Sequence, residues 1–144
     1  MSAPHNLDFA HINLYLAITK GCQCAPAHWI ILMQHPGSPE CTWLHSVINE
    51  DNQYEVMIEP AKRFDSWSFA SKDFLVRLPI CQKSTILAMA KAVPAQSCQC
   101  WASYMLLRFQ NYGYLDQGTY EVWRDLHMTS RRLDRGPGCM VCQC

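Results

Sequence analysis

The 144-residue sequence lacks three features that would each assign it to a broad class of protein. Twelve basic residues balance twelve acidic ones, whereas nucleic-acid-binding domains normally carry a basic excess or stripe. No apolar run approaches the roughly 18 to 20 residues that span a bilayer. The first eight residues contain neither the basic nor the apolar region of a secretory signal. We therefore expect a cytoplasmic protein with no nucleic-acid partner.

The composition is that of one globular domain with an unusual number of cysteines. Hydrophobic residues make up 49% of the chain and charged residues 17%, so the chain can bury a core and is not disordered by composition. Nine cysteines are an odd number, which in a secreted protein would leave one without a partner. In a reducing cytoplasm all nine remain thiols, and we expect this second state.

The first half of the chain has the patterns of strands. Residues 9–19 have a period of two, with Ile12, Leu14, Leu16 and Ile18 on one face, which predicts a strand with one buried side. Residues 28–34 are apolar on both faces and predict a central strand. Further strands are expected at 42–48, 54–58 and 74–78.

The second half has the spacing of helices. Apolar residues recur at helical intervals in 84–93, from Cys98 to Gly113, and in 119–128. Strands first and helices last predict an α+β fold, with a small antiparallel sheet packed against helices. We expect one domain over residues 1–129 and a flexible, cysteine-rich tail over 130–144.

Cys98 is the candidate nucleophile. It follows a break at Pro94 and begins a helical pattern, and the unpaired N–H groups and dipole of a helix N-terminus lower the pKa of a thiol there. A buried structural cysteine is an equally good interpretation of the residue. Cys100, two residues later, is an alternative reactive thiol.

The candidate base is His28, because it opens the apolar central strand, where its ring can be held rigidly. His45, on the next predicted strand, is placed to orient the ring of His28 by a hydrogen bond. We expect the Cys98 sulfur to lie within hydrogen-bonding reach of His28, directly or through one water. Trp29, Gln99 and Trp101 flank the two groups and are the candidate substrate-binding residues.

Three segments, residues 27–33, 42–46 and 97–101, together resemble the permuted papain-like superfamily. This group includes the NlpC-type peptidases and the lecithin:retinol acyltransferase-like enzymes. In the acyltransferase-like branch a His-Trp strand precedes a strand with a second histidine, and the nucleophile lies in an Asn-Cys-x-x-Phe helix start. Here Ser97-Cys98-Gln99-Cys100-Trp101 takes that place. An uncharacterised fungal domain family, with a Gly-Cys-x-x-Trp helix start, is similar over roughly residues 9–126.

The resemblance implies a permuted papain-like fold and thiol-dependent hydrolysis or transfer of an acyl group, without a cofactor. Cys98 would attack the carbonyl, His28 would accept and return the proton, and His45 would orient His28. A second hypothesis is a fungal secondary-metabolite protein that binds a polyketide or peptide intermediate and assists its cyclisation or addition. A third is a non-catalytic binding module.

Two further patterns suggest less favoured roles for the cysteines. The tripeptide Cys-Gln-Cys occurs three times, at 22–24, 98–100 and 142–144, but only Cys139-Met140-Val141-Cys142 has the spacing of a zinc knuckle, so we expect no metal. The terminal Cys-x-Cys is similar to doubly prenylated ends. Membrane association through these cysteines is an alternative to the passive tail that we favour.

Overall fold

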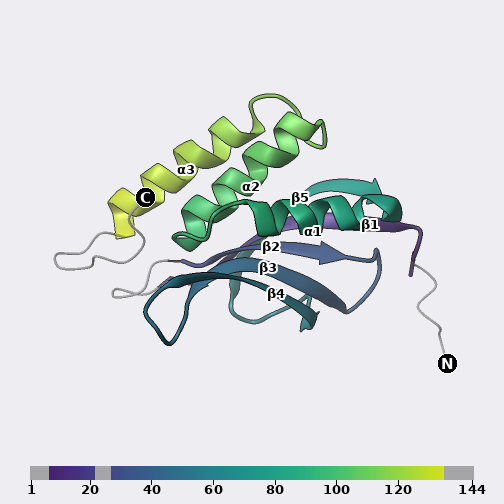
Figure 1. Ribbon diagram of the computed structural model, residues 1–144, viewed down its shortest axis with the longest axis horizontal. Helices are drawn as coiled ribbons and strands as arrows, with labels where there is room; N and C mark the ends of the chain where they lie inside the picture. The colour runs from purple at the N-terminus through teal and green to yellow at the C-terminus, as the bar shows by residue number, and fades with distance from the viewer. Residues whose placement is uncertain (1–6, 22–26, 135–144) are drawn as a thin grey trace.

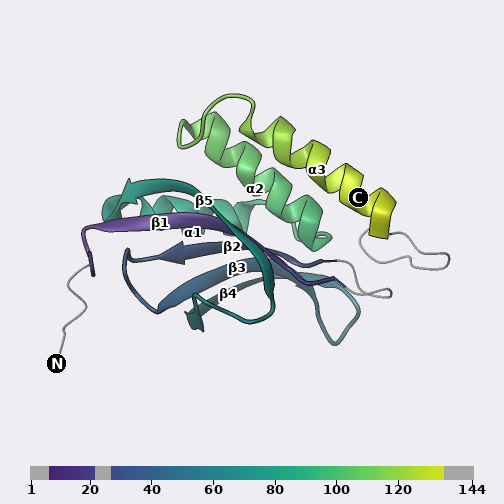
Figure 2. The same cartoon turned by 180° about the vertical axis from the view of Figure 1, so that it is seen from behind.

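The computed structural model describes residues 7–21 and 27–134, with side chains described to residue 126. They form a five-stranded antiparallel sheet with three α-helices on one of its faces (Figures 1 and 2). The strands are β1 (His11–Thr19), β2 (Trp29–Gln34), β3 (Glu40–Ile48), β4 (Tyr54–Arg63) and β5 (Phe69–Pro79). They lie in the order β4-β3-β2-β1-β5, so the expected α+β class is confirmed.

The central position of β2 explains its composition. All six of its residues are buried, because β1 and β3 flank it and both of its faces are covered. Trp29, Ile31 and Met33 face the helices, whereas Ile30 and Leu32 belong to a smaller cluster on the opposite face. Odd-numbered residues of β2 therefore face the helices and even-numbered residues face the opposite side, since side chains alternate along a strand.

The helices follow a short 3₁₀ turn (Ile80–Gln82) and comprise α1 (Lys83–Ala92), α2 (Cys98–Tyr112) and α3 (Thr119–Asp134). Pro94 disfavours helical backbone in the residue before it, and Val93 is accordingly extended. Gly113 ends α2 in the left-handed conformation, at φ 92°, which glycine adopts without the steric cost of a Cβ.

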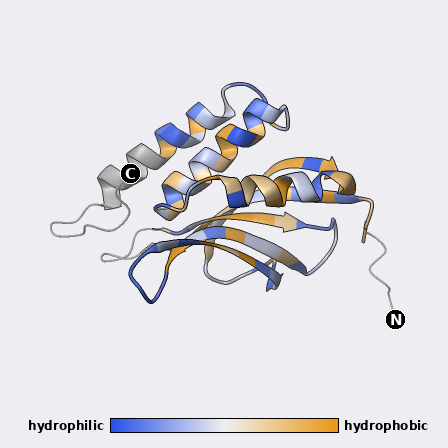
Figure 3. Cartoon of the chain, viewed as in Figure 1, coloured by the Kyte–Doolittle hydropathy of each residue, from blue (hydrophilic) through white to orange (hydrophobic). Residues whose placement is uncertain are grey.

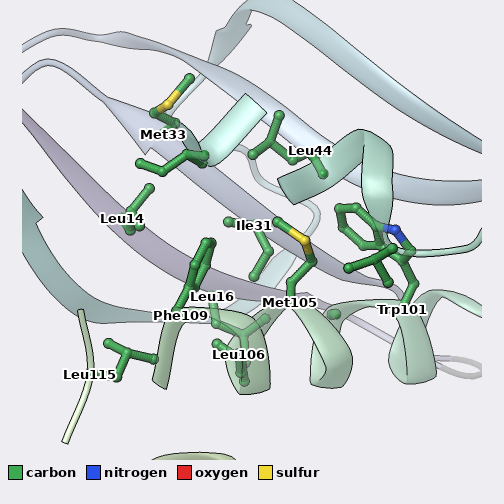
Figure 4. Close-up of a cluster of buried hydrophobic side chains, with 14 of the residues drawn as sticks. Leu14, Leu16, Ile31, Met33, Leu44, Trp101, Met105, Leu106, Phe109 and Leu115 are labelled. Atoms are coloured by element: carbon green, nitrogen blue, oxygen red, sulfur yellow. The ribbon is translucent and has the colours of Figure 1, made fainter. Parts of the chain in front are cut away.

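The main core lies between the sheet and α2. Trp101, Met105, Leu106 and Phe109 project from one side of α2 onto the sheet and are fully buried (Figure 4). The strands meet this surface with leucine, isoleucine and methionine side chains, and hydrophobic residues concentrate on β2 and α1 in Figure 3. Burying such side chains supplies the dominant favourable free energy of folding.

The structure extends several sequence-based boundaries. β4 reaches Arg63 and β5 starts at Phe69, beyond the predicted 54–58 and 74–78. α3 continues to Asp134 and so includes residues 130–134 of the expected tail. The rest of the expected tail, 135–144, lies outside the described residues. Among the described residues, no helix is both long enough and apolar enough to cross a membrane.

Candidate functional site

Three side chains from three neighbouring strands form a hydrogen-bonded chain, which we call the His–His–Glu relay. Nε2 of His28 lies 2.7 Å from Nδ1 of His45, and Nε2 of His45 lies 2.6 Å from Oε1 of Glu59. The expected hydrogen bond between His28 and His45 is therefore present. Glu59 completes the relay and was not anticipated from the sequence.

The strand register places these groups on one face of the sheet. The ladder of β1 and β2 continues past Trp29, because Thr19 donates its N–H to the carbonyl of His28 at 2.9 Å. His28 consequently shares a face with Ile30. On β3, Leu44 contributes to the core under the helices, so His45 lies on the opposite face with Trp43, whose ring contacts it. Glu59 pairs with Trp43 across β3 and β4 and is thus diagonal to His45.

The hydrogen-bond partners fix the proton positions in the neutral relay. An ionised carboxylate only accepts hydrogen bonds, so Nε2 of His45 carries the hydrogen and donates it to Glu59. Nδ1 of neutral His45 is then an acceptor, and Nε2 of His28 must donate to it. Nδ1 of His28 is left with the lone pair. The relay therefore ends in an imidazole nitrogen that can accept a proton.

Burial keeps both imidazoles neutral. Desolvation, followed by the neighbouring His45, lowers the pKa of His28 from 6.5 to about 4, and the charge of Glu59 opposes this shift. Desolvation also lowers the pKa of His45, against the hydrogen bond and charge of Glu59. The hydrogen bond from His45 lowers the pKa of Glu59. At neutral pH the relay thus consists of two neutral imidazoles and one carboxylate.

Aromatic and cationic groups border the relay. The Trp43 ring lies 6.0 Å from the His45 ring and 5.5 Å from that of Phe69, measured between centroids. The Lys62 ammonium lies 4.5 Å from the Trp43 ring and 3.8 Å from Oε2 of Glu59. An apolar aromatic surface therefore adjoins a proton-accepting group, which is the composition of a site for a small organic molecule.

Cys98 is the first residue of α2, as predicted, and its thiol is buried. Two hydrogen bonds attach this end of α2 to the sheet. Gln99 donates Nε2–H to the carbonyl of Ala27 at 2.9 Å, and Ser46 donates its hydroxyl to the carbonyl of Gln96 at 2.5 Å. The helix start is thus close to the beginning of β2.

Although the start of α2 is close in space to the beginning of β2, Cys98 and His28 belong to different layers, the helices and the sheet. α2 packs on one face of the sheet (Figures 1 and 2), the face that contains Trp29 and Leu44. Strand alternation places the His–His–Glu relay on the face that contains Ile30 and Trp43. The body of α2 and the relay therefore lie on opposite faces of the sheet. The pairing of the Cys98 sulfur with His28 stays a prediction.

The three candidate substrate-binding residues are buried in the interior of the protein. Trp29, Gln99 and Trp101 are at most 1% exposed. Trp29 packs edge-to-face on Trp123 of α3, and Gln99 joins α2 to the carbonyl of Ala27. Such burial leaves no surface for a ligand, so these residues build the core, and the expectation that they bind substrate is not supported.

The cysteines differ in redox state. Cys100 is disulfide-bonded, so the alternative that it is the reactive thiol is wrong, and so is the expectation that all nine cysteines are thiols. Cys41 and Cys98 are buried thiols. Desolvation raises the pKa of Cys41 to about 11, which makes this thiol a poor nucleophile at neutral pH.

Comparison with protein-family models, with curated proteins and with solved structures finds no match to this chain. The described residues also contain no cluster of three or more histidine, cysteine or acidic side chains arranged to hold a metal ion. The function must therefore be inferred from the geometry of the described side chains.

Proposed function

We propose that this protein is an enzyme that transfers a proton at carbon in a small, largely apolar carbonyl compound, with His28 as the general base. The observation that carries the proposal is the chain of hydrogen bonds from His28 through His45 to Glu59, at 2.7 and 2.6 Å. It leaves the lone pair on Nδ1 of His28, which is the arrangement that general-base catalysis requires. The reaction would be a cyclisation or an addition, as for a polyketide or peptide intermediate.

The proposed step begins with transfer of a proton from the carbon next to a carbonyl to Nδ1 of His28. The C–H electron pair forms an enolate, whose carbon attacks a second carbonyl carbon of the same molecule. A C–C bond forms, and the new alkoxide takes the proton back from His28. During the step, Glu59 stabilises the positive charge on His28 through His45, because an imidazolium is favoured by a hydrogen-bonded carboxylate.

The pKa of His28 indicates which substrates are suitable. A value of about 4 keeps the imidazole unprotonated at neutral pH but gives it a low proton affinity. Such a base is suited to an activated C–H bond, for example between two carbonyl groups, because proton transfer is efficient when the acidities of donor and acceptor are similar. Trp43 and Phe69 would contact the apolar part of such a molecule.

A second candidate is thiol-dependent acyl hydrolysis or transfer on a permuted papain-like fold, with Cys98 as the nucleophile. The position of Cys98 in the first turn of α2 supports it, as does the hydrogen bond that joins Gln99 to the residue before His28. The placement of the relay on the other face of the sheet argues against it.

Chromogenic probes separate the two candidates. 5-Nitrobenzisoxazole loses an activated C–H proton to a base, and its N–O bond then breaks to release a coloured phenolate. We expect the wild type to accelerate this reaction, His28→Gln to abolish the acceleration, and Cys98→Ser to retain it. p-Nitrophenyl acetate reports acyl transfer instead. A burst of nitrophenol that Cys98→Ser removes, together with no acceleration of the nitrobenzisoxazole reaction, would contradict the proposed base and favour the thiol.

A further inference from the structure

A cavity of about 260 Å³ lies at the end of the sheet away from His28, where β2 ends and β3 begins. Its floor includes Ile12 and Met33, which are 1% and 4% exposed. The volume is below the roughly 300–1,000 Å³ of sites for drug-sized ligands. The cavity therefore suits a ligand with only a few heavy atoms and a short apolar side chain.

His35 lines this cavity and has a defined tautomer when neutral. Its Nδ1 lies 3.2 Å from the backbone carbonyl of His11, and a carbonyl oxygen only accepts, so Nδ1 carries the hydrogen. Nε2 then holds a lone pair. The Phe9 ring packs edge-on against the His35 ring, with 5.3 Å between centroids, and helps to fix its orientation. His35 thus supplies a hydrogen-bond acceptor.

Two opposite charges also line the cavity. Glu40 begins β3, and Lys83 begins α1. Neither forms an ion pair with another residue in the described part of the chain. Lys83 also opposes the α1 dipole, because a cation in the first turn of a helix is unfavourable. Local helix stability therefore gives no reason for a lysine there, whereas an anionic ligand group would.

We propose that this cavity binds a small zwitterion with an apolar side chain, of the chemical class of an aliphatic α-amino acid. Lys83 binds the carboxylate, Glu40 and Nε2 of His35 bind the ammonium, and Ile12 and Met33 contact the side chain. The site is independent of the His–His–Glu relay, since no residue is shared between them.

Isothermal titration calorimetry with three probes tests this site. L-Leucine carries both charges, 4-methylpentanoate lacks the ammonium, and 3-methylbutylamine lacks the carboxylate. We expect leucine to bind about tenfold more tightly than either analogue, because one charge-assisted hydrogen bond supplies about that factor. The methyl resonance of Met33 in ¹³C-labelled protein should shift with leucine and thereby locate the binding.

Charge variants with matched controls complete the test. Glu40→Gln should reduce the affinity for leucine about tenfold, to the affinity of the wild type for 4-methylpentanoate. Lys83→Gln should reduce the affinity for leucine to that of the wild type for 3-methylbutylamine. Glu55→Gln on β4 and Lys91→Gln in the last turn of α1 remove the same charges elsewhere and should leave the affinity unchanged. The proposal is wrong if leucine gives neither heat nor a Met33 shift at millimolar concentration. It is also wrong if the two analogues bind as tightly as leucine, or if the cavity variants bind like their controls.

Discussion

Acid should lower the free energy of unfolding through protonation of His28. The difference between the pKa values of His28 in the folded and unfolded states sets the size of this effect. The unfolded chain protonates this histidine near pH 6.5, whereas the folded protein does so only near pH 4. Between these values the unfolded state binds more protons, so the free energy of unfolding falls as the pH is lowered. From pH 7 to pH 5 the loss attributable to His28 is about 2 kcal/mol, and it reaches at most about 3 kcal/mol below pH 4.

Urea denaturation at pH 7 and pH 5 measures this contribution. In His28→Gln the amide N–H can still donate to Nδ1 of His45 but does not titrate, so the loss between the two pH values should shrink by about 2 kcal/mol. The range stops at pH 5 because protonation of Glu59 would add to the loss in stronger acid. His35→Gln keeps the relay and is the matched control. If His28→Gln loses as much stability as the wild type, the burial argument for His28 is refuted.

Three other substitutions test the remaining parts of the structure. Phe109→Ala should cost about 3–5 kcal/mol of unfolding free energy in urea denaturation, because it opens a cavity in the main core; a cost below about 1 kcal/mol would show that α2 does not pack as described. Gly113→Ala should lower stability by about 1–2 kcal/mol, because alanine is strained at φ 92°; an unchanged melting temperature would contradict this C-cap. Gln99→Ala should cost about 1–3 kcal/mol, because it leaves the part-buried carbonyl of Ala27 without its donor. Equal stability of Gln99→Ala and wild type would show that this hydrogen bond does not attach α2 to the sheet.

Local patterns predicted the fold where one side of an element is buried. Ile12, Leu14 and Leu16 of β1 alternate along the strand and face the main core, whereas Ala17 is buried in the smaller cluster on the opposite face. β2 is apolar throughout and is central. The edge strands β4 and β5 were predicted too short, because much of each remains solvent-accessible and their sequences mix charged and apolar residues. Pairing with an inner strand, which no local pattern records, determines their length.

The candidate site was predicted only for the residues that lie on strands with clear local patterns. His28 and His45 are both on strands with clear patterns, and their contact follows once β2 and β3 are neighbours. Glu59 escaped prediction because its contact with His45 depends on the β3–β4 register, which pairs Trp43 with Glu59 and His45 with Met57, and because the predicted strand ended at residue 58. The face of the sheet that α2 covers, with Cys98 at its start, could not be predicted either. A helix start in the sequence does not specify on which face of the sheet the helix packs.

Imidazole ¹⁵N NMR of the two relay histidines tests the central claim most directly, because nitrogen shifts report which ring atom carries hydrogen. We predict that at pH 7 both His28 and His45 carry it on Nε2, that Nδ1 of His28 has the shift of a lone-pair nitrogen, and that His28 titrates near pH 4. In Glu59→Gln the shift of His45 should change, because its acceptor becomes neutral. A His28 ring that titrates near pH 6.5, with shifts insensitive to Glu59→Gln, would contradict the relay and the function proposed from it.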